Sequence, residues 1–185
     1  MHDLRHTFAA RLRRFGVSNE VRKDLLAHAN SDITTHYSAG ELRELLEADE
    51  GIKHEVYLDH LGKATTGIGH LILKGDDEHG WPVGAIVSEE RVSELFTQDV
   101  QTALKDALWL HPDLDSWPIA GQITVVSLAF QLGAPRYSKF VKHHEALEQD
   151  PPMWMTAAAE LRDSKLYRQT PKRTERHAQR LESLA

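Results

Sequence analysis

The chain has 185 residues, no cysteine and a formal net charge of −6 at pH 7, so it can bury one sizeable core without disulfides. No window of about 20 apolar residues occurs, which excludes a membrane-spanning helix of ordinary length. The N-terminus is charged and lacks the apolar core of a signal peptide, so we expect no export signal.

Residues 1–40 show two short amphipathic patterns. Apolar side chains recur at helical spacing from Phe8 to Phe15, where Gly16 ends the pattern, and a second pattern runs from Val21 to Leu26. We therefore predict a small helical appendage ahead of the principal domain. A few Arg and Lys side chains give it a basic face, and a face of this size is usually only solvated.

Three motifs in the appendage have the spacing of a known active site. They are His2-Asp-Leu-Arg5, Leu25-Leu-Ala-His28 and Thr34-Thr-His-Tyr37. In this order they resemble the C-terminal end of a tyrosine recombinase of the phage integrase family. The resemblance implies that His2 and Arg5 belong to a phosphate-binding cluster, that His28 assists and that Tyr37 is the nucleophile.

The other catalytic groups of a recombinase have no counterpart in this sequence, so the charge of a scissile phosphate could not be stabilised. We interpret residues 1–40 as a noncatalytic helical fragment and do not expect nucleic acid to be a partner. The alternative function is that of a noncatalytic DNA-binding protein derived from a tyrosine recombinase.

The run from Asp49 to His70 is rich in groups that could carry chemistry. Glu50 and Asp59 are two carboxylates nine residues apart, and Thr65 and a Gly-rich turn follow them. Hydrolysis of a glycosidic bond needs one protonated carboxyl group for the leaving oxygen and one ionised carboxylate that acts on water or on the sugar cation. This run could supply both.

The local patterns predict different surroundings for the two carboxyl groups. Leu42, Leu46 and Glu50 share the apolar face of a predicted helix that ends at Gly51, and desolvation there favours a neutral, proton-donating carboxyl group. Asp59 follows a predicted strand and begins a polar turn, where a carboxylate stays ionised. The alternative is that Glu50 is a surface acid at a helix end and Asp59 an ordinary turn residue.

The rest of the chain favours a small sheet followed by helices. The segment 70–73 reads as a strand, and an acidic turn over residues 76–80 follows it. The sequence therefore predicts an α+β fold with a small β-containing lobe and a larger helical lobe. The predicted helices span residues 88–109, 123–132, 153–166 and 171–184.

Several motifs together resemble the T-even type of phage lysozyme over residues 41–185. They are Asp49-Glu-Gly, Tyr57-x-Asp, Thr65-x-Gly-Ile-Gly-His70, Ser127-Leu-Ala-Phe-Gln-Leu-Gly133, Phe140 and Ser164-Lys-Leu-Tyr-Arg-Gln-Thr-Pro-Lys-Arg173. The resemblance implies a lysozyme-like domain at 41–185 and a muramidase that hydrolyses β-1,4 glycosidic bonds of bacterial peptidoglycan.

The same resemblance implies roles for individual residues. Glu50 is the general acid, Asp59 positions or deprotonates water, and Thr65 helps to hold that water in a reaction that inverts the anomeric centre. Arg173 pairs with Glu50 and helps to hold its orientation. Apart from the resemblance, we expect His70 to be a structural residue with a carboxylate partner rather than a catalytic base. The residues implied at the sugar cleft are Leu71, Phe130 and His143, with Glu160 standing where the family has an amide.

We expect neither a metal nor another cofactor. No HExxH motif occurs, and the pairs His54 with His60 and His143 with His144 lack a third ligand at a readable spacing. The expected partner is peptidoglycan. We expect synthesis in the host bacterial cytoplasm and action in the periplasm, with access through a holin-type pore.

The charge distribution bears on how the wall is reached. Residues 1–40 contain six Lys or Arg and four Asp or Glu, a charge of +2, so the remaining residues carry −8. Such a domain lacks long-range attraction for an anionic wall, and we expect its capture of the wall to depend little on salt.

Overall fold

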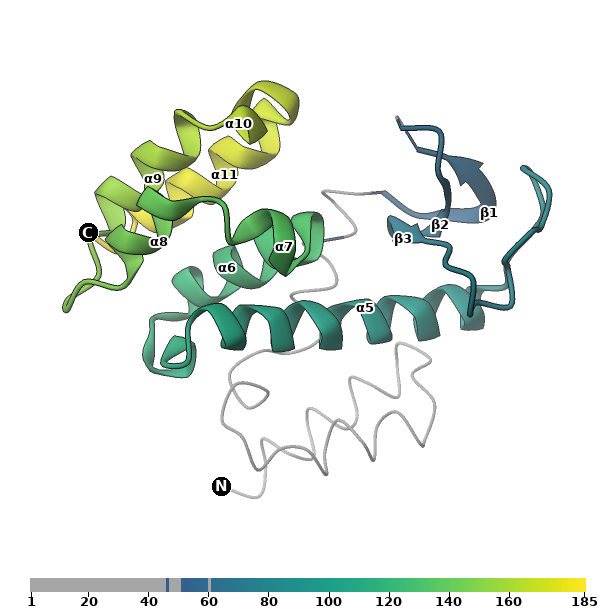
Figure 1. Cartoon of the computed structure of the whole chain (residues 1–185), viewed down its shortest axis with the longest axis horizontal. Helices are drawn as coiled ribbons and strands as arrows, with labels where there is room; N and C mark the ends of the chain where they lie inside the picture. The colour runs from purple at the N-terminus through teal and green to yellow at the C-terminus, as the bar shows by residue number, and fades with distance from the viewer. Residues whose placement is uncertain (1–45, 47–50, 60) are drawn as a thin grey trace, which may run out of the picture. The chain divides into compact units, whose positions relative to one another are not determined.

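The computed structural model describes Leu46, residues 51–59 and residues 61–185 (Figure 1). Glu50, His60 and the recombinase-like segment 1–40 lie outside the described residues, so the division into 1–40 and 41–185 stays a prediction. Leu46 is helical and buried, as its place on the predicted apolar stripe requires. The chain forms two compact units that meet in sequence between Asp99 and Val100, and each unit is described separately.

The first unit contains a three-stranded antiparallel sheet in the order β1-β2-β3. Its strands are β1 (Lys53–Leu58), β2 (Ala64–Gly67) and β3 (His70–Leu71). The predicted strand over residues 56–58 and the turn after it are therefore confirmed, and the third strand is shorter than the predicted segment 70–73. Val56 of β1 packs with Val87 and Val92 in an apolar cluster.

The Gly67-Ile-Gly69 run is required by the backbone at the end of β2. Gly67 has a φ of 61° and Gly69 a φ of 75°, both in the left-handed region that favours glycine. A Cβ on Gly67 would also lie 3.2 Å from Cγ1 of Val92. The turn from β2 to β3 can therefore pack closely against the first turn of the next helix.

That helix is α5 (Glu89–Leu110), and Ser88 begins it by accepting a hydrogen bond from the N–H of Arg91 at 3.1 Å. The Arg91 side chain binds Glu78 at 2.7 Å through Nε and at 3.1 Å through Nη2. Glu78 is only 1% exposed, so this bidentate pair fixes the loop after the sheet to α5.

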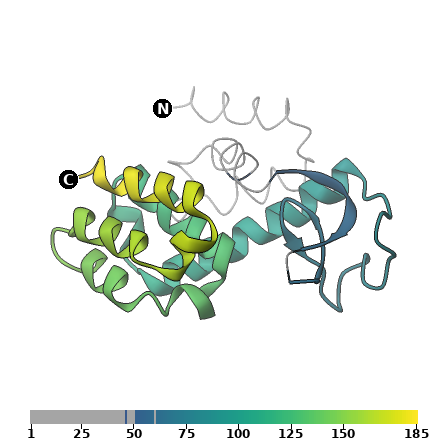
Figure 2. The same cartoon turned by 90° about the horizontal axis from the view of Figure 1, so that it is seen from above.

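The second unit is helical (Figure 2). The apolar helix predicted over 123–132 is confirmed as α6, whose residues 124–129 are all buried. Helix α11 packs against α6, α9 and α10, and α9 also packs against α8. Its elements beyond α5 are η1 (Leu114–Ser116), α6 (Ile119–Leu132), α7 (Ala134–Tyr137), α8 (Val141–Leu147), α9 (Trp154–Arg162), α10 (Lys165–Gln169) and α11 (Pro171–Glu182).

The prediction of one helix over residues 153–166 is wrong. The chain forms α9 and α10 with a break at Asp163 and Ser164. Ser164 Oγ donates to the carbonyl of Leu161 and accepts the N–H of Tyr167, so this side chain ends one helix and caps the next. The short helices α7 and α8 were not predicted. The predicted α+β class is confirmed, and no helix among the described residues is long and apolar enough to span a membrane.

Candidate active site

Asp59 begins the tight turn that joins β1 to β2. Its Oδ1 accepts hydrogen bonds from the backbone N–H groups of Leu61 and Lys63, each at 2.8 Å. The N–H of Gly62 donates to the Asp59 carbonyl at 2.9 Å, and Gly62 has a φ of 74°. The turn therefore holds the carboxylate in one orientation, with two donors directed at the same oxygen.

Thr65 is linked to this turn through the backbone of Lys63. Its Oγ1 donates to the Lys63 carbonyl at 3.1 Å, and the N–H of Asp59 donates to the same carbonyl at 2.9 Å. Because the Thr65 hydrogen is used in this bond, the hydroxyl oxygen can act only as an acceptor toward another group. The predicted pair Asp59 and Thr65 is thus brought together by one short turn.

Leu71 lies on the same row of the sheet as Thr65. Thr65 pairs with Tyr57 on one side and with Leu71 on the other, and directly paired residues project from the same face of a sheet. The Lys53 ammonium lies 4.0 Å from the centre of the Tyr57 ring. This row therefore joins a hydroxyl, an aromatic ring and an exposed apolar side chain, and the Lys53 cation lies over the ring.

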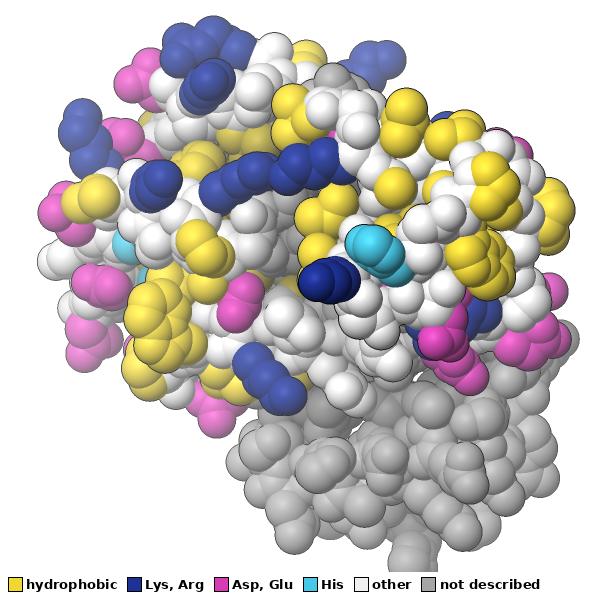
Figure 3. Space-filling view, turned by 45° about the vertical axis from the view of Figure 1, so that its right-hand side comes forward, with side chains coloured by type: hydrophobic (Ala, Val, Ile, Leu, Met, Phe, Trp, Pro, Cys, Tyr) yellow, Lys and Arg dark blue, Asp and Glu magenta, His cyan; other side chains and the backbone are white. Residues whose placement is uncertain are grey.

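Exposed hydrophobic side chains gather over the sheet and the loop that follows it (Figure 3). Leu71 is among them at 39% exposure, so a side chain predicted to contact sugar is accessible in this unit. The others in this stretch include Leu58, Leu73, Trp81, Val83 and Ile86.

His70 is held between two carboxylates, as a structural histidine should be. Nδ1 lies 2.9 Å from Oδ2 of Asp99 on α5, and Nε2 lies 3.3 Å from Oδ2 of Asp76. Burial by itself would lower the pKa of His70, but the hydrogen bonds and charges of Asp99 and Asp76 outweigh burial and raise it. The predicted carboxylate partner is confirmed, and there are two.

Asp76 also accepts the N–H of Leu73 at 2.5 Å. Burial opposes the charge on Asp76, but this backbone hydrogen bond and His70 together lower the pKa of Asp76. The pair therefore fixes the segment after β3 in place, and with it the neighbouring Leu71.

Phe130, His143 and Arg173 belong to the second unit. Phe130 is half-buried near the end of α6, and Arg173 is half-buried in the first turn of α11. The predicted pairing of Arg173 with Glu50 stays a prediction, because Glu50 lies outside the described residues.

His143 is 1% exposed on α8, and both of its ring nitrogens are hydrogen-bonded within the protein. Nε2 lies 3.0 Å from the Tyr137 hydroxyl and Nδ1 lies 2.9 Å from the Ala157 carbonyl. Its role as a sugar contact stays a prediction, and such a contact would use the edge of the ring rather than a ring nitrogen.

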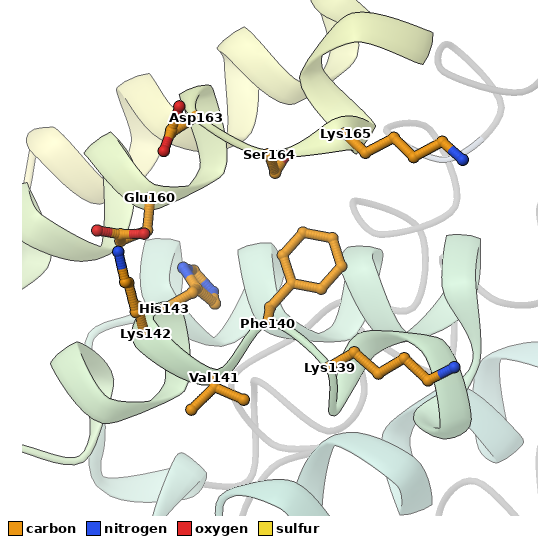
Figure 4. Close-up of a pocket in the computed structure, with 9 residues that line it drawn as sticks. All are labelled: Lys139, Phe140, Val141, Lys142, His143, Glu160, Asp163, Ser164 and Lys165. Carbon is orange, nitrogen blue, oxygen red and sulfur yellow. The ribbon is translucent and has the colours of Figure 1, made fainter.

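A cavity of about 370 Å³ lies beside His143 (Figure 4). The Phe140 ring points into it, and Glu160, the acid that stands where the family has an amide, reaches it from α9. The remaining lining residues are Lys139, Val141, Lys142, Asp163, Ser164 and Lys165. The walls thus combine an aromatic surface with both signs of charge.

The motifs did not reveal several of these contacts. Asp99 lies in the middle of a long helix, and nothing in its spacing marks it as the partner of His70. The internal bonds of His143 depend on Tyr137 and Ala157, which come from two other segments.

No group of three or more His, Cys, Asp or Glu that could hold a metal ion occurs within the part of the chain that the structure describes.

Comparison with known proteins places these features in a family. The family described as Phage lysozyme matches residues 47–163, which include Glu50, Asp59, Thr65 and His143. The probable T4-type lysozyme 2 of Dictyostelium discoideum is 32% identical over 157 residues, which cover 73% of this chain and 89% of that protein.

Two phage proteins are similar over part of their length. The pre-baseplate central spike protein Gp5 of Enterobacteria phage T4 is 30% identical over 73% of this chain and 26% of that protein. The peptidoglycan hydrolase gp36 of Pseudomonas phage phiKMV is 28% identical over 75% of this chain and 15% of that protein. The resemblance that the motifs predict is thereby confirmed, and the chain belongs to the phage lysozyme family and is a glycoside hydrolase.

Proposed function

We propose that this chain is an endolysin that hydrolyses the β-1,4 glycosidic bonds of bacterial peptidoglycan, with Glu50 as general acid and Asp59 as general base. The observation that carries the proposal is the turn in which two backbone N–H groups hold the Asp59 carboxylate beside Thr65. The peptidoglycan hydrolase among its relatives supports the choice of substrate.

In the proposed reaction, Glu50 gives its proton to the glycosidic oxygen as the bond from that oxygen to the anomeric carbon breaks. Asp59 takes a proton from water, and the water oxygen bonds to the anomeric carbon from the opposite face, which inverts the configuration. Thr65 Oγ1 donates to Lys63, so it accepts the second hydrogen of the water. Exchange with solvent then returns both carboxyl groups to their starting states.

The supporting roles are proposed from the resemblance to the phage lysozyme family. Leu71, Phe130 and His143 are the proposed sugar contacts, and Arg173 is the proposed positioning residue for Glu50. His70 keeps β3 in place through Asp76 and Asp99, so it supports Leu71 without touching substrate.

Purified peptidoglycan tests the reaction. The parent chain should release reducing ends, and proton NMR of early products should show the α-anomer, the inverted configuration. Asp59→Asn should lower kcat by about two orders of magnitude or more, and Asp77→Asn, at a side chain that is 85% exposed, should not. Early formation of the β-anomer would contradict inversion, and full activity of Asp59→Asn would contradict the role of Asp59.

For access to the wall, we propose synthesis in the host cytoplasm and release to the periplasm through a holin-type pore. Cells that express the chain together with a pore-forming lysis protein should lyse, and cells that express the chain alone should not. Lysis by the chain alone, at matched expression, would contradict the need for a pore.

For residues 1–40, the interpretation as a noncatalytic recombinase-derived fragment stays a proposal, motivated by His2, Arg5, His28 and Tyr37. Filter binding of duplex DNA at moderate salt tests it, since binding through phosphate contacts requires a larger cationic surface than the few Arg and Lys side chains of this segment provide. Retention of DNA by the full chain at micromolar concentration would instead favour the alternative of a DNA-binding protein.

A further inference from the structure

All four histidines of the helical unit are buried, and none has a carboxylate of a described residue hydrogen-bonded to its ring. His111, His143, His144 and His177 are between 0% and 8% exposed. They come from different elements of the unit: His111 follows α5, His143 and His144 lie on α8, and His177 lies on α11. Their hydrogen bonds decide which protonation state the fold accepts.

The bonds of His143 favour a neutral ring. The Ala157 carbonyl can only accept, so His143 Nδ1 carries the hydrogen, and in the neutral ring Nε2 accepts from the Tyr137 hydroxyl. Complete burial raises the pKa of Tyr137, so the hydroxyl keeps its hydrogen. A proton added to Nε2 would meet the hydrogen of Tyr137 and displace it.

The surroundings of His144 and His111 favour the same state. His144 Nε2 donates to the Tyr137 carbonyl at 2.9 Å, so in the neutral ring His144 Nδ1 accepts from Nε2 of His111, also at 2.9 Å. The remaining nitrogen of His111, Nδ1, is buried and has no hydrogen-bond partner in the described structure. A proton added to this pair would therefore face a second N–H group or occupy a buried nitrogen without an acceptor.

His177 is surrounded by positive charge. Its Nδ1 lies 3.2 Å from Nη1 of Arg180 and its Nε2 is buried without a hydrogen-bond partner among the described residues. Burial is the main cause that lowers the pKa of His177 to about 3, and Arg180, Arg173 and Arg176 lower it further.

The charged groups around the other three rings do not reverse this preference. Burial lowers the pKa of His111 to about 4 despite Asp113, and that of His143 to about 3. Burial also lowers the pKa of His144, although Glu148 and the hydrogen bond to Tyr137 oppose it. The four histidines also repel one another when charged, which adds to the penalty for each further proton.

We propose that His111, His143, His144 and His177 make the fold of the helical unit sensitive to acid. The unit is stably folded while all four rings are neutral, and it is destabilised in mildly acidic solution. The enzyme is then folded at neutral pH and loses activity in acid because the helical unit unfolds. This inference concerns folding and does not depend on the proposed catalytic residues.

The sign of the pH dependence follows from the number of protons that the folded and unfolded states bind. In the unfolded chain each ring regains an ordinary pKa near 6.5, whereas the folded rings stay neutral well below that value. The unfolded state therefore binds more protons, so the stabilisation is complete above pH 6.5 and is lost as the pH falls below it. His70 acts in the opposite sense because its pKa is raised on folding.

Thermal unfolding of the full chain, followed by tryptophan fluorescence and circular dichroism, tests this acid sensitivity. Tm should fall by at least about 10 °C between pH 7 and pH 5. Calorimetry in two buffers of different ionisation enthalpy should show uptake of about three protons on unfolding at pH 5.5. A flat Tm over this range, or uptake near zero, would overturn the proposal without any variant.

Matched variants assign the effect to the rings. His111→Gln keeps a donor for His144 Nδ1 and His177→Asn keeps an acceptor for Arg180, while both remove a titrating ring. The double variant should lose about half of the Tm decrease between pH 7 and pH 5. His79→Asn, at an exposed histidine, should leave the decrease unchanged. An unchanged decrease in the folded double variant would contradict the proposal.

Discussion

Asp59 and Lys63 bind each other twice across the turn between β1 and β2. Asp59 Oδ1 accepts the N–H of Lys63 at 2.8 Å, and the N–H of Asp59 donates to the carbonyl of Lys63 at 2.9 Å. The same carbonyl accepts the Thr65 hydroxyl. One backbone residue therefore fixes both side chains that are proposed to act on water, and the conformation of the turn should control catalysis.

Gly62→Ala tests this dependence. Gly62 has a φ of 74° with nothing within 4 Å of an added Cβ, so the substitution strains the backbone without a steric clash. We expect a loss of about 1 kcal/mol in the free energy of unfolding and a lower kcat with KM little changed. Gly75→Ala is the control, because Gly75 also has open space but no left-handed φ. Equal effects of the two substitutions would contradict the role of the turn.

The contacts of His70 with Asp99 and Asp76 should give a pH-dependent contribution to stability. Because Asp99 and Asp76 raise the pKa of His70, its stabilisation is present below pH 6.5 and is lost as the pH rises through the raised value. Asp99→Asn should therefore reduce stability by about 1–3 kcal/mol at pH 6 and by less at pH 9. Denaturant unfolding at both pH values checks this, with a larger effect at pH 9 as the contrary result.

The buried pair of Glu78 and Arg91 should matter more than the exposed contact of the same arginine. Glu78→Gln weakens two charge-assisted hydrogen bonds at a side chain that is 1% exposed, and we expect a loss of about 1–3 kcal/mol. Glu94→Gln removes a contact of 3.4 Å at the surface and should change stability little. Equal Tm values for the two variants at pH 7 would contradict this ranking.

Gly121→Ala should destabilise the protein even though Gly121 lies in α6. Alanine favours a helix over glycine by about 1 kcal/mol, but its Cβ would lie 3.0 Å from Cη2 of the buried Trp154. Overpacking at a closed site costs about 1–3 kcal/mol, so the net change should be a loss. Gly121→Ala with Trp154→Phe should recover part of it relative to Trp154→Phe alone. A higher Tm for the single variant would show that the ring moves aside.

The acidic charge predicts weak dependence of lysis on salt. The whole chain carries −6, so it lacks long-range attraction for an anionic wall. We expect the lytic rate on isolated walls to change by less than about twofold between 50 and 200 mM salt, a range that shortens the Debye length. A steep fall over this range would show that a local cationic surface governs capture.

The features that the sequence predicts well are those set by local chemistry. The strand before Asp59, the turn after it, the start of α5 at Ser88 and the buried helix α6 follow from spacing and turn residues alone. The glycines after Thr65 mark left-handed backbone that few other residues adopt.

The features that the sequence predicts poorly depend on tertiary contacts. Ser164 breaks a continuous helical pattern because its side chain bonds the backbone on both sides. The carboxylate partner of His70 was expected, but only the packing of α5 identifies Asp99. The state of His143 depends on Tyr137 and Ala157, which no spacing links to it.

The most direct test of the account is lysis of outer-membrane-permeabilised Gram-negative cells, followed as loss of turbidity. Glu50→Gln keeps the shape of the side chain and removes the proton that it would donate, and Glu55→Gln changes an exposed acid as a control. We predict lysis by the parent and by Glu55→Gln, and a loss of at least about a hundredfold for Glu50→Gln. Lysis at the parental rate by Glu50→Gln would contradict the assignment of the general acid.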